Sequence, residues 1–97
     1  MHTIAERLTW ARTQAGFERR ELARLAGLGS ETHVGLIESG ERPDPRGSTI
    51  KKLAQALGVP FGWLAAGEGE QPTVDALRLI GERQRSANAS VPQAAVA

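Results

Sequence analysis

The chain has 97 residues, of which 40% are hydrophobic, a formal net charge of +1 and no cysteine. This length and composition fit one domain with an apolar core, and they exclude a fully disordered chain. The absence of cysteine excludes disulfides and thiolate zinc sites, and the longest apolar runs are only a few residues, too short to span a bilayer. The N-terminal stretch MHTIAERLTWARTQ carries charges where a secretory signal would be apolar, so we expect a cytoplasmic protein that binds no membrane.

Apolar residues recur with helical spacing throughout, and no segment alternates with the period of two that a half-buried strand requires. The predicted helices are bounded by hydroxyl caps and by glycines. Five helices are expected before residue 68: 4–15, a short helix that ends at Gly27, 31–38 capped by Ser30, one that is capped by Ser48 and ends at Gly58, and 60–66. The expected fold class is therefore all-α.

The sequence changes character beyond Gly67. The stretch GEGEQP is typical of a linker, and Thr73 is placed to cap a sixth helix over about 73–85. The remaining SANASVPQAAVA has small residues and no apolar pattern, so we expect a mobile tail. We accordingly divide the chain into a domain at 1–69 and a C-terminal segment at 70–97.

The segment from Arg19 to Gly40, RRELARLAGLGSETHVGLIESG, predicts a short helix, a glycine turn and a second helix. This is the order of a helix-turn-helix. Ala23 is small enough for the two helices to cross closely, and Val34 and Ile37 are expected to hold the second helix on the core. The opposite face of that helix is then free to lie in a DNA major groove.

Four pieces of sequence occur in the right order: ELARLAG, V-x-x-I-E-x-G, T-I-x-x-L-A-x-A-L-G-V and W-L-x-x-G-E. Together they resemble the Cro and phage-repressor (XRE-like) class of helix-turn-helix DNA-binding domains, and are especially similar to those of the phage lambda and 434 repressors. The resemblance covers about residues 4–67. It implies a compact five-helix bundle of the lambda-repressor type, to which this chain adds the sixth helix.

The resemblance also implies which residues contact bases at the start of the second helix of the motif. The matching positions are Glu31, Thr32, His33 and Leu36. A glutamate can accept a hydrogen bond from a cytosine amino group, and a threonine methyl can meet a thymine methyl. Other roles stay open: Glu31 and Thr32 could serve only the first helical turn, His33 could be ordinary surface or contact a phosphate, and Leu36 could be packing.

Five further positions match phosphate contacts of the resembling repressors: Arg19, Ser30, Ser39, Arg42 and Arg46. Without the resemblance, isolated arginines such as these would be assigned to solvated surface. The chain has no polybasic tail that would bind nucleic acid by charge alone, so binding depends on where these side chains are placed.

The resemblance implies a buried or half-buried salt bridge between Arg12 of the first helix and Glu38 of the third. Each residue follows an apolar position of its helix, so both flank the same core. A guanidinium can then hold the carboxylate through two charge-assisted hydrogen bonds. The alternative is a pair of independent surface charges.

Dimerisation in the resembling family involves the fifth helix, which places Phe61 and Trp63 at a dimer interface; Trp63 could also lie in the core. Leu77 belongs to an apolar stripe of the sixth helix that is too short to be stable alone. The stripe needs a surface, either Trp10 or the partner subunit, and we place Leu77 at the dimer interface as well.

The hypothesis for function is a sequence-specific transcriptional regulator, more specifically a repressor, that binds a pseudo-palindromic operator in double-stranded DNA as a homodimer. An enzyme is not expected, because the two histidines lack metal-ligand spacing and no nucleophile or phosphate-binding motif occurs. We expect no cofactor and no metal. The alternatives are an antitoxin-type protein that neutralises a partner toxin through residues 72–97 and represses its own operon, and a protein adaptor that selects no DNA sequence.

Overall fold

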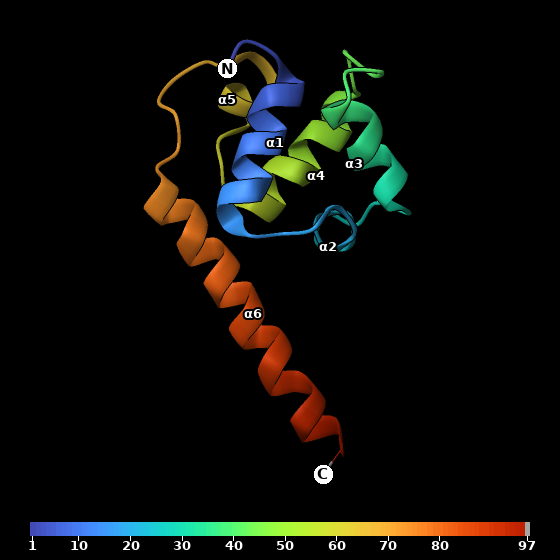
Figure 1. The fold of residues 1–97 in the computed structure, drawn as a ribbon, viewed down its shortest axis with the longest axis vertical. Coiled ribbons are helices and arrows are strands. Elements are labelled where there is room, and N and C mark those ends of the chain that lie inside the picture. The colour runs from blue at the N-terminus through green and yellow to red at the C-terminus, as the bar shows by residue number, and fades with distance from the viewer. Residues whose placement is uncertain (97) are drawn as a thin grey trace.

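The fold was obtained as a computed structural model that describes the backbone of residues 1–96 and the side chains of residues 1–87. Within these residues the chain is helical and contains no strand. The helices are α1 (Ile4–Ala15), α2 (Arg19–Leu25), α3 (Glu31–Glu38), α4 (Gly47–Leu57), α5 (Phe61–Ala66) and α6 (Val74–Val96). Helices α1 to α5 form a bundle, and α6 extends away from it (Figure 1). No helix in this part of the chain is long and apolar enough to cross a membrane.

The core of the bundle is aliphatic, as the scarcity of aromatic residues requires. Every helix of the bundle contributes at least one side chain that is almost fully shielded from solvent: Leu8, Leu22, Val34, Ile37, Leu53, Leu57 and Leu64. Among them are Val34 and Ile37, the two residues that were predicted to hold the third helix on the core. Burial of such side chains is the main favourable contribution to folding, since each removes a large apolar surface from water. The all-α five-helix bundle with a sixth helix is confirmed.

The ends of α1 illustrate how local chemistry sets the helix bounds. At its start, the Thr3 hydroxyl accepts from the Glu6 amide and the Glu6 carboxylate accepts from the Thr3 amide, at 3.2 and 3.3 Å, so the two residues form a capping box. Hydrogen bonds from the His2 amide and the Thr3 hydroxyl lower the pKa of Glu6. At its end, Gly16 has φ +80°, a conformation that a side chain would disfavour.

The buried Arg7 of α1 holds the end of α5. Its Nε donates to the Leu64 carbonyl at 2.9 Å and its Nη2 to the Ala65 carbonyl at 3.1 Å. Those carbonyls lie in the last turn of a six-residue helix, where no further turn supplies amide donors. The guanidinium satisfies them and also lies at the negative end of the helix dipole.

Helix α6 packs on α1 through its first turns. Leu77 is buried, and a Cβ added to Gly81 would lie only 1.9 Å from the carbonyl oxygen of Ala15. The two backbones therefore approach as closely as a glycine allows. Trp10 does not depend on α6 for its aromatic contact, because it packs edge-to-face on Trp63 with ring centroids 6.0 Å apart.

Two predicted boundaries are wrong. Helix α4 begins at Gly47 with Arg46 as its N-cap residue, so Ser48 lies inside the first turn and does not cap it. Helix α6 continues to Val96, well beyond the predicted end near residue 85 and through the predicted tail at 86–97, of which residue 97 lies outside the described residues. The stretch after residue 86 is rich in alanine, which favours helix without any apolar stripe. The predicted cap of α6 by Thr73 is present, since its hydroxyl accepts from the Ala76 amide at 3.1 Å.

Candidate nucleic-acid interface

Helices α2 and α3 are joined by a tight turn that begins at Gly27, which has φ +72°. The Leu28 amide donates to the Ala23 carbonyl at 2.8 Å and closes the end of α2. The Ser30 hydroxyl accepts from the Thr32 amide at 3.1 Å, so Ser30 caps α3 as predicted. Turn and cap together fix where α3 starts relative to α2.

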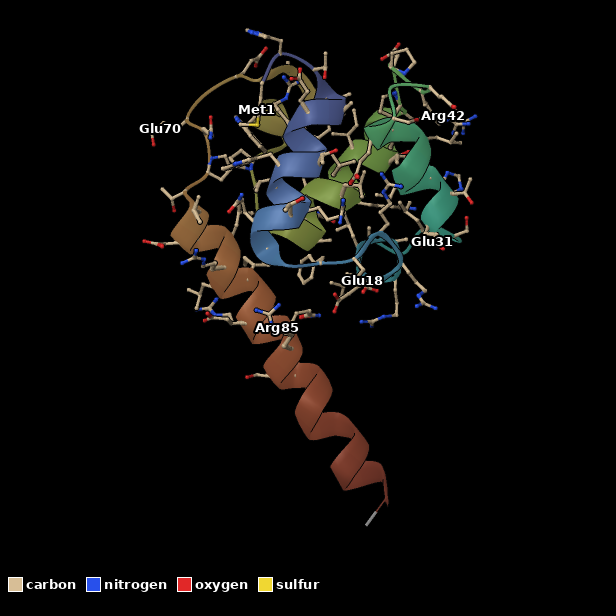
Figure 2. All side chains as sticks on the ribbon, in the orientation of Figure 1. Met1, Glu18, Glu31, Arg42, Glu70 and Arg85 are labelled. Atoms are coloured by element: carbon tan, nitrogen blue, oxygen red, sulfur yellow. The ribbon has the colours of Figure 1, made fainter. Side chains whose placement is uncertain are left out.

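The inner face of α3 is buried through Val34 and Ile37, as predicted. Its outer face carries the four predicted base-contacting residues: Glu31, Thr32 and His33 are exposed and Leu36 is half-buried. Glu31 lies at the start of α3 and Arg42 beyond its end, both along the outer edge of the bundle (Figure 2). The orientation of α3 therefore leaves the polar side chains of its first turn accessible and Leu36 partly so.

An open hollow of about 460 Å³ lies between α2 and the outer face of α3. It is lined by Arg19, Glu31, Thr32, Gly35, Leu36, Ser39 and Glu41. The hollow thus brings together three of the predicted base-contacting residues and two of the predicted phosphate-contacting residues. His33, Arg42 and Arg46 do not line it.

The predicted ion pair between Arg12 and Glu38 is present and forms the centre of a larger anchor. Arg12 donates from Nε and Nη2 to the two carboxylate oxygens of Glu38, at 2.6 and 3.0 Å. Its Nη1 donates to the Phe17 carbonyl at 2.8 Å. Arg19 of α2 also donates from Nε to Glu38, at 3.1 Å. We call Arg12, Arg19 and Glu38 the arginine–glutamate anchor.

The three side chains of the anchor differ in exposure: the exposed fraction is 1% for Glu38, 17% for Arg12 and 49% for Arg19. The buried carboxylate of Glu38 thus accepts from the largely buried guanidinium of Arg12 and from the half-exposed guanidinium of Arg19. Two positive charges face one negative charge, which leaves the site with a surplus of one positive charge next to α3. Because charge-assisted hydrogen bonds are directional, they fix the orientation of the last turn of α3.

The bond from Arg19 to Glu38 was not predicted. Arg19 was expected only to contact phosphate, and no spacing rule connects positions 19 and 38. Gly35 gives a partial signal, because a glycine inside a helix costs stability and indicates a close approach. A Cβ there would lie 3.9 Å from Nη1 of Arg19, so the arginine extends over the outer face of α3 at this point.

The other predicted phosphate-contacting residues are differently placed. The Ser39 hydroxyl donates to the Leu36 carbonyl at 3.1 Å and accepts from the Glu41 amide at 3.3 Å, so it closes the end of α3 and its proton is already used. The Ser30 hydroxyl acts as an acceptor in its cap and keeps its proton. Arg42 and Arg46 are exposed in the loop between α3 and α4, and neither forms an ion pair within the described residues.

The three residues predicted at a dimer interface differ in their exposure within one protomer, and the interface itself stays a prediction. Trp63 and Leu77 are only 3% and 1% exposed within one protomer, whereas Phe61 is 47% exposed. Trp63 packs on Trp10, and Leu77 fills the space between α6 and the bundle. The apolar surface of Trp63 and Leu77 is buried inside the protomer. Of the three residues predicted at the dimer interface, Phe61 is therefore the one that is accessible to a partner.

A helix, a tight glycine turn and a second helix with a buried inner face and a polar outer face define a helix-turn-helix domain. The family model described as a helix-turn-helix domain matches residues 3–66, which is well over half of the chain. The chain belongs to this family, and the predicted resemblance is confirmed.

Among the described residues, no group of three or more acidic or histidine side chains could hold a metal ion.

The curated relatives carry names from the same class. The transcriptional repressor RghR of Bacillus subtilis (strain 168) is 36% identical over 61 residues, which cover 63% of this chain and 44% of the relative. The transcriptional regulator for conjugative element R391 of Providencia rettgeri is 37% identical over 70 residues, covering 72% of this chain and 31% of the relative. This chain therefore spans less than half the length of these relatives. No solved structure gives a significant match.

Proposed function

We propose that this chain is a transcriptional regulator, acting as a repressor, that binds a specific DNA sequence through α3. The observation that supports this most strongly is the orientation of α3: its outer polar face is accessible while its last turn is held by the arginine–glutamate anchor. A helix that reads bases must meet the groove at a fixed angle, since base contacts require hydrogen-bond geometry. The names of the relatives support the same function.

In this proposal α3 lies in the major groove and the arginines around it contact the backbone of the DNA. Nη1 and Nη2 of Arg19 form no hydrogen bond within the described residues, so they are available to a phosphate while Nε stays on Glu38. Arg42 and Arg46 contact phosphates beyond the other end of α3. Phosphate contacts of this kind position the protein and supply most of the salt-dependent affinity.

The proposed active form is a homodimer on a pseudo-palindromic site. A two-fold axis would place two copies of α3 in successive major grooves about 34 Å apart. Phe61 offers exposed apolar surface for the contact between protomers.

The experiment that tests the proposal is selection of bound sequences from random duplex DNA. We expect one enriched motif with two-fold symmetry, and a plot of log affinity against log salt concentration with a slope of roughly −5 to −7, from about six to eight phosphate contacts per dimer. Sedimentation of the complex measures whether two protomers bind one site. Absence of an enriched motif, or a slope near zero, would overturn the proposal.

A second candidate is the antitoxin-type protein. It is supported by α6, which extends away from the bundle and could present a helix to a partner protein (Figure 1). A toxin reading frame beside the gene, and inhibition of its product by this chain, would support this function. If the chain binds no such product, the antitoxin function is excluded and the transcriptional regulator remains the proposed function.

A further inference from the structure

The connection between α1 and α2 consists of only three residues, Gly16, Phe17 and Glu18, and it lies next to the arginine–glutamate anchor. Arg12 donates from Nη1 to the Phe17 carbonyl at 2.8 Å, and the Phe17 amide donates to the Arg12 carbonyl at 3.1 Å. The Phe17 side chain is buried as well. The conformation of this connection is therefore tied to the guanidinium that holds α3.

Helix α6 packs on the end of α1 at which this connection begins. The backbone of Gly81 approaches the Ala15 carbonyl so closely that a Cβ would overlap with it. The guanidinium of Arg85 covers Gly16, since its Nη1 would lie 3.0 Å from a Cβ added there. A positive charge is favoured at this place, because the C-terminal end of a helix carries the negative end of its dipole.

These contacts form a continuous path from α6 to α3. Gly81 and Arg85 contact residues 15 and 16, and the next residue along the chain is hydrogen-bonded to Arg12. Arg12 in turn holds Glu38 in the last turn of α3. The first turns of α6 themselves lie away from α3, on the other side of α1 (Figure 1). Because hydrogen bonds are directional, a shift of the connection changes the geometry of the anchor.

We propose that α6 positions α3 for DNA recognition by holding the connection between α1 and α2, with Gly81 and Arg85 as the positioning residues. This inference rests on the proposed function, because it requires that α3 reads DNA. In this arrangement α6 contributes to the selection of a base sequence although it contacts no DNA. Its role is to keep the angle at which α3 meets the groove.

The experiment measures a specificity ratio, the affinity for the selected DNA site divided by the affinity for its single-base-pair variants. A variant that only lowers the folded fraction weakens both affinities equally and leaves this ratio unchanged. We expect Arg85→Ala to lower the ratio about threefold, as for a residue within a coupling path. Gly81→Ala displaces α6 from the Ala15 carbonyl and should lower it roughly tenfold.

The matched control is Arg83→Ala on the same helix. Arg83 is exposed and forms no ion pair within the described residues. Its replacement removes the same charge from α6 as Arg85→Ala does, so any general electrostatic effect on DNA affinity is equal in the two variants. The specificity ratio of Arg83→Ala should match that of the unchanged protein.

The inference is overturned if Arg85→Ala and Arg83→Ala give the same ratio, or if folded Gly81→Ala keeps the full ratio. Arg85→Ala decides the matter if Gly81→Ala does not fold, because Arg85 is exposed and its loss leaves Leu77 in place. These outcomes leave the proposed function intact, because they require that a specific site has already been selected. Failure to select any site contradicts the proposed function itself.

Discussion

Helices α3 and α6 both pack on the bundle through buried apolar residues, but α3 is also held by the arginine–glutamate anchor. The buried Glu38 of α3 receives hydrogen bonds from Arg12 of α1 and Arg19 of α2. Helix α6 is held by Leu77 and by the close approach of Gly81 to the Ala15 carbonyl. A set of directional hydrogen bonds defines an angle, whereas close apolar packing defines a distance.

This difference matches what the two helices have to do. A helix that reads DNA must keep its angle to the rest of the domain, and the arginine–glutamate anchor supplies that at the expense of removing charges from water. The anchor is therefore sensitive to the loss of one partner. The contact between α6 and α1 depends on the buried Leu77 and on the absence of a Cβ at Gly81, and the Arg85 guanidinium of α6 lies beside Gly16 at the end of α1.

The largest effect is expected from Arg12→Met. Loss of this arginine leaves the buried Glu38 with only the single hydrogen bond from Arg19, and breaking a buried ion pair costs about 3–5 kcal/mol. Because Arg19 remains, we expect a decrease in the free energy of unfolding of about 3 kcal/mol, at the lower end of that range. Urea unfolding measures it.

Two variants sharpen this result. Arg19→Met should cost less than about 1 kcal/mol, because Arg19 is half-exposed and its ion pair is screened by water. Adding Glu38→Leu to Arg12→Met should recover part of the loss, since it removes the uncompensated charge. A loss below about 1 kcal/mol in Arg12→Met would show that the pair does not anchor α3.

The second prediction concerns Gly81→Ala in α6. The new Cβ would meet the Ala15 carbonyl, which is backbone and cannot move aside, so the two helices must separate. We expect the free energy of unfolding to fall by about 2 kcal/mol, as for an overpacked core. The steric overlap outweighs the higher helix propensity of alanine, which acts in the opposite direction. Amide hydrogen exchange around Leu77 should become faster.

The control for this variant is Gly47→Ala in the first turn of α4, where a Cβ would have no neighbour within 4 Å. Its stability should be unchanged or slightly higher, because alanine reduces the freedom of the unfolded chain. Equal behaviour of the two variants would contradict the close approach of α6 to α1.

The third prediction concerns Ser30→Ala, which removes the cap of α3 and leaves the anchor intact. Loss of a hydroxyl cap costs about 1 kcal/mol. Ser48→Ala is the matched control, because Ser48 forms no cap and should tolerate the change. If Ser30→Ala costs as little as Ser48→Ala in thermal unfolding, the start of α3 is held by packing alone.

Most features that depend on neighbouring residues were predictable from the sequence, but the cap expected at Ser48 and the end expected for α6 were wrong. The caps by Ser30 and Thr73 and the buried positions Val34 and Ile37 follow from local hydrogen bonding and helical periodicity. The pair of Arg12 and Glu38 came from the family resemblance, because two charges distant in sequence carry no signal of their own contact.

Features that depend on tertiary geometry were not predictable. The partners of Arg7 are backbone carbonyls, which have no residue signature. The contact of Arg19 with Glu38 requires knowing how α2 crosses α3. The family resemblance placed Trp63 at a dimer interface and an apolar stripe placed Leu77 there, and neither signal distinguishes a surface between protomers from one within a protomer.

The most direct test of the account compares Thr32→Ala and Arg46→Ala on the selected DNA site and on its single-base-pair variants. Thr32→Ala should relax preference at one base pair per half-site by about 1–3 kcal/mol and leave the other positions unchanged. Arg46→Ala should weaken all sequences alike and reduce the magnitude of the salt slope by about two, because each dimer loses two phosphate contacts. If both variants weaken every sequence uniformly, α3 does not read the bases and the account is contradicted.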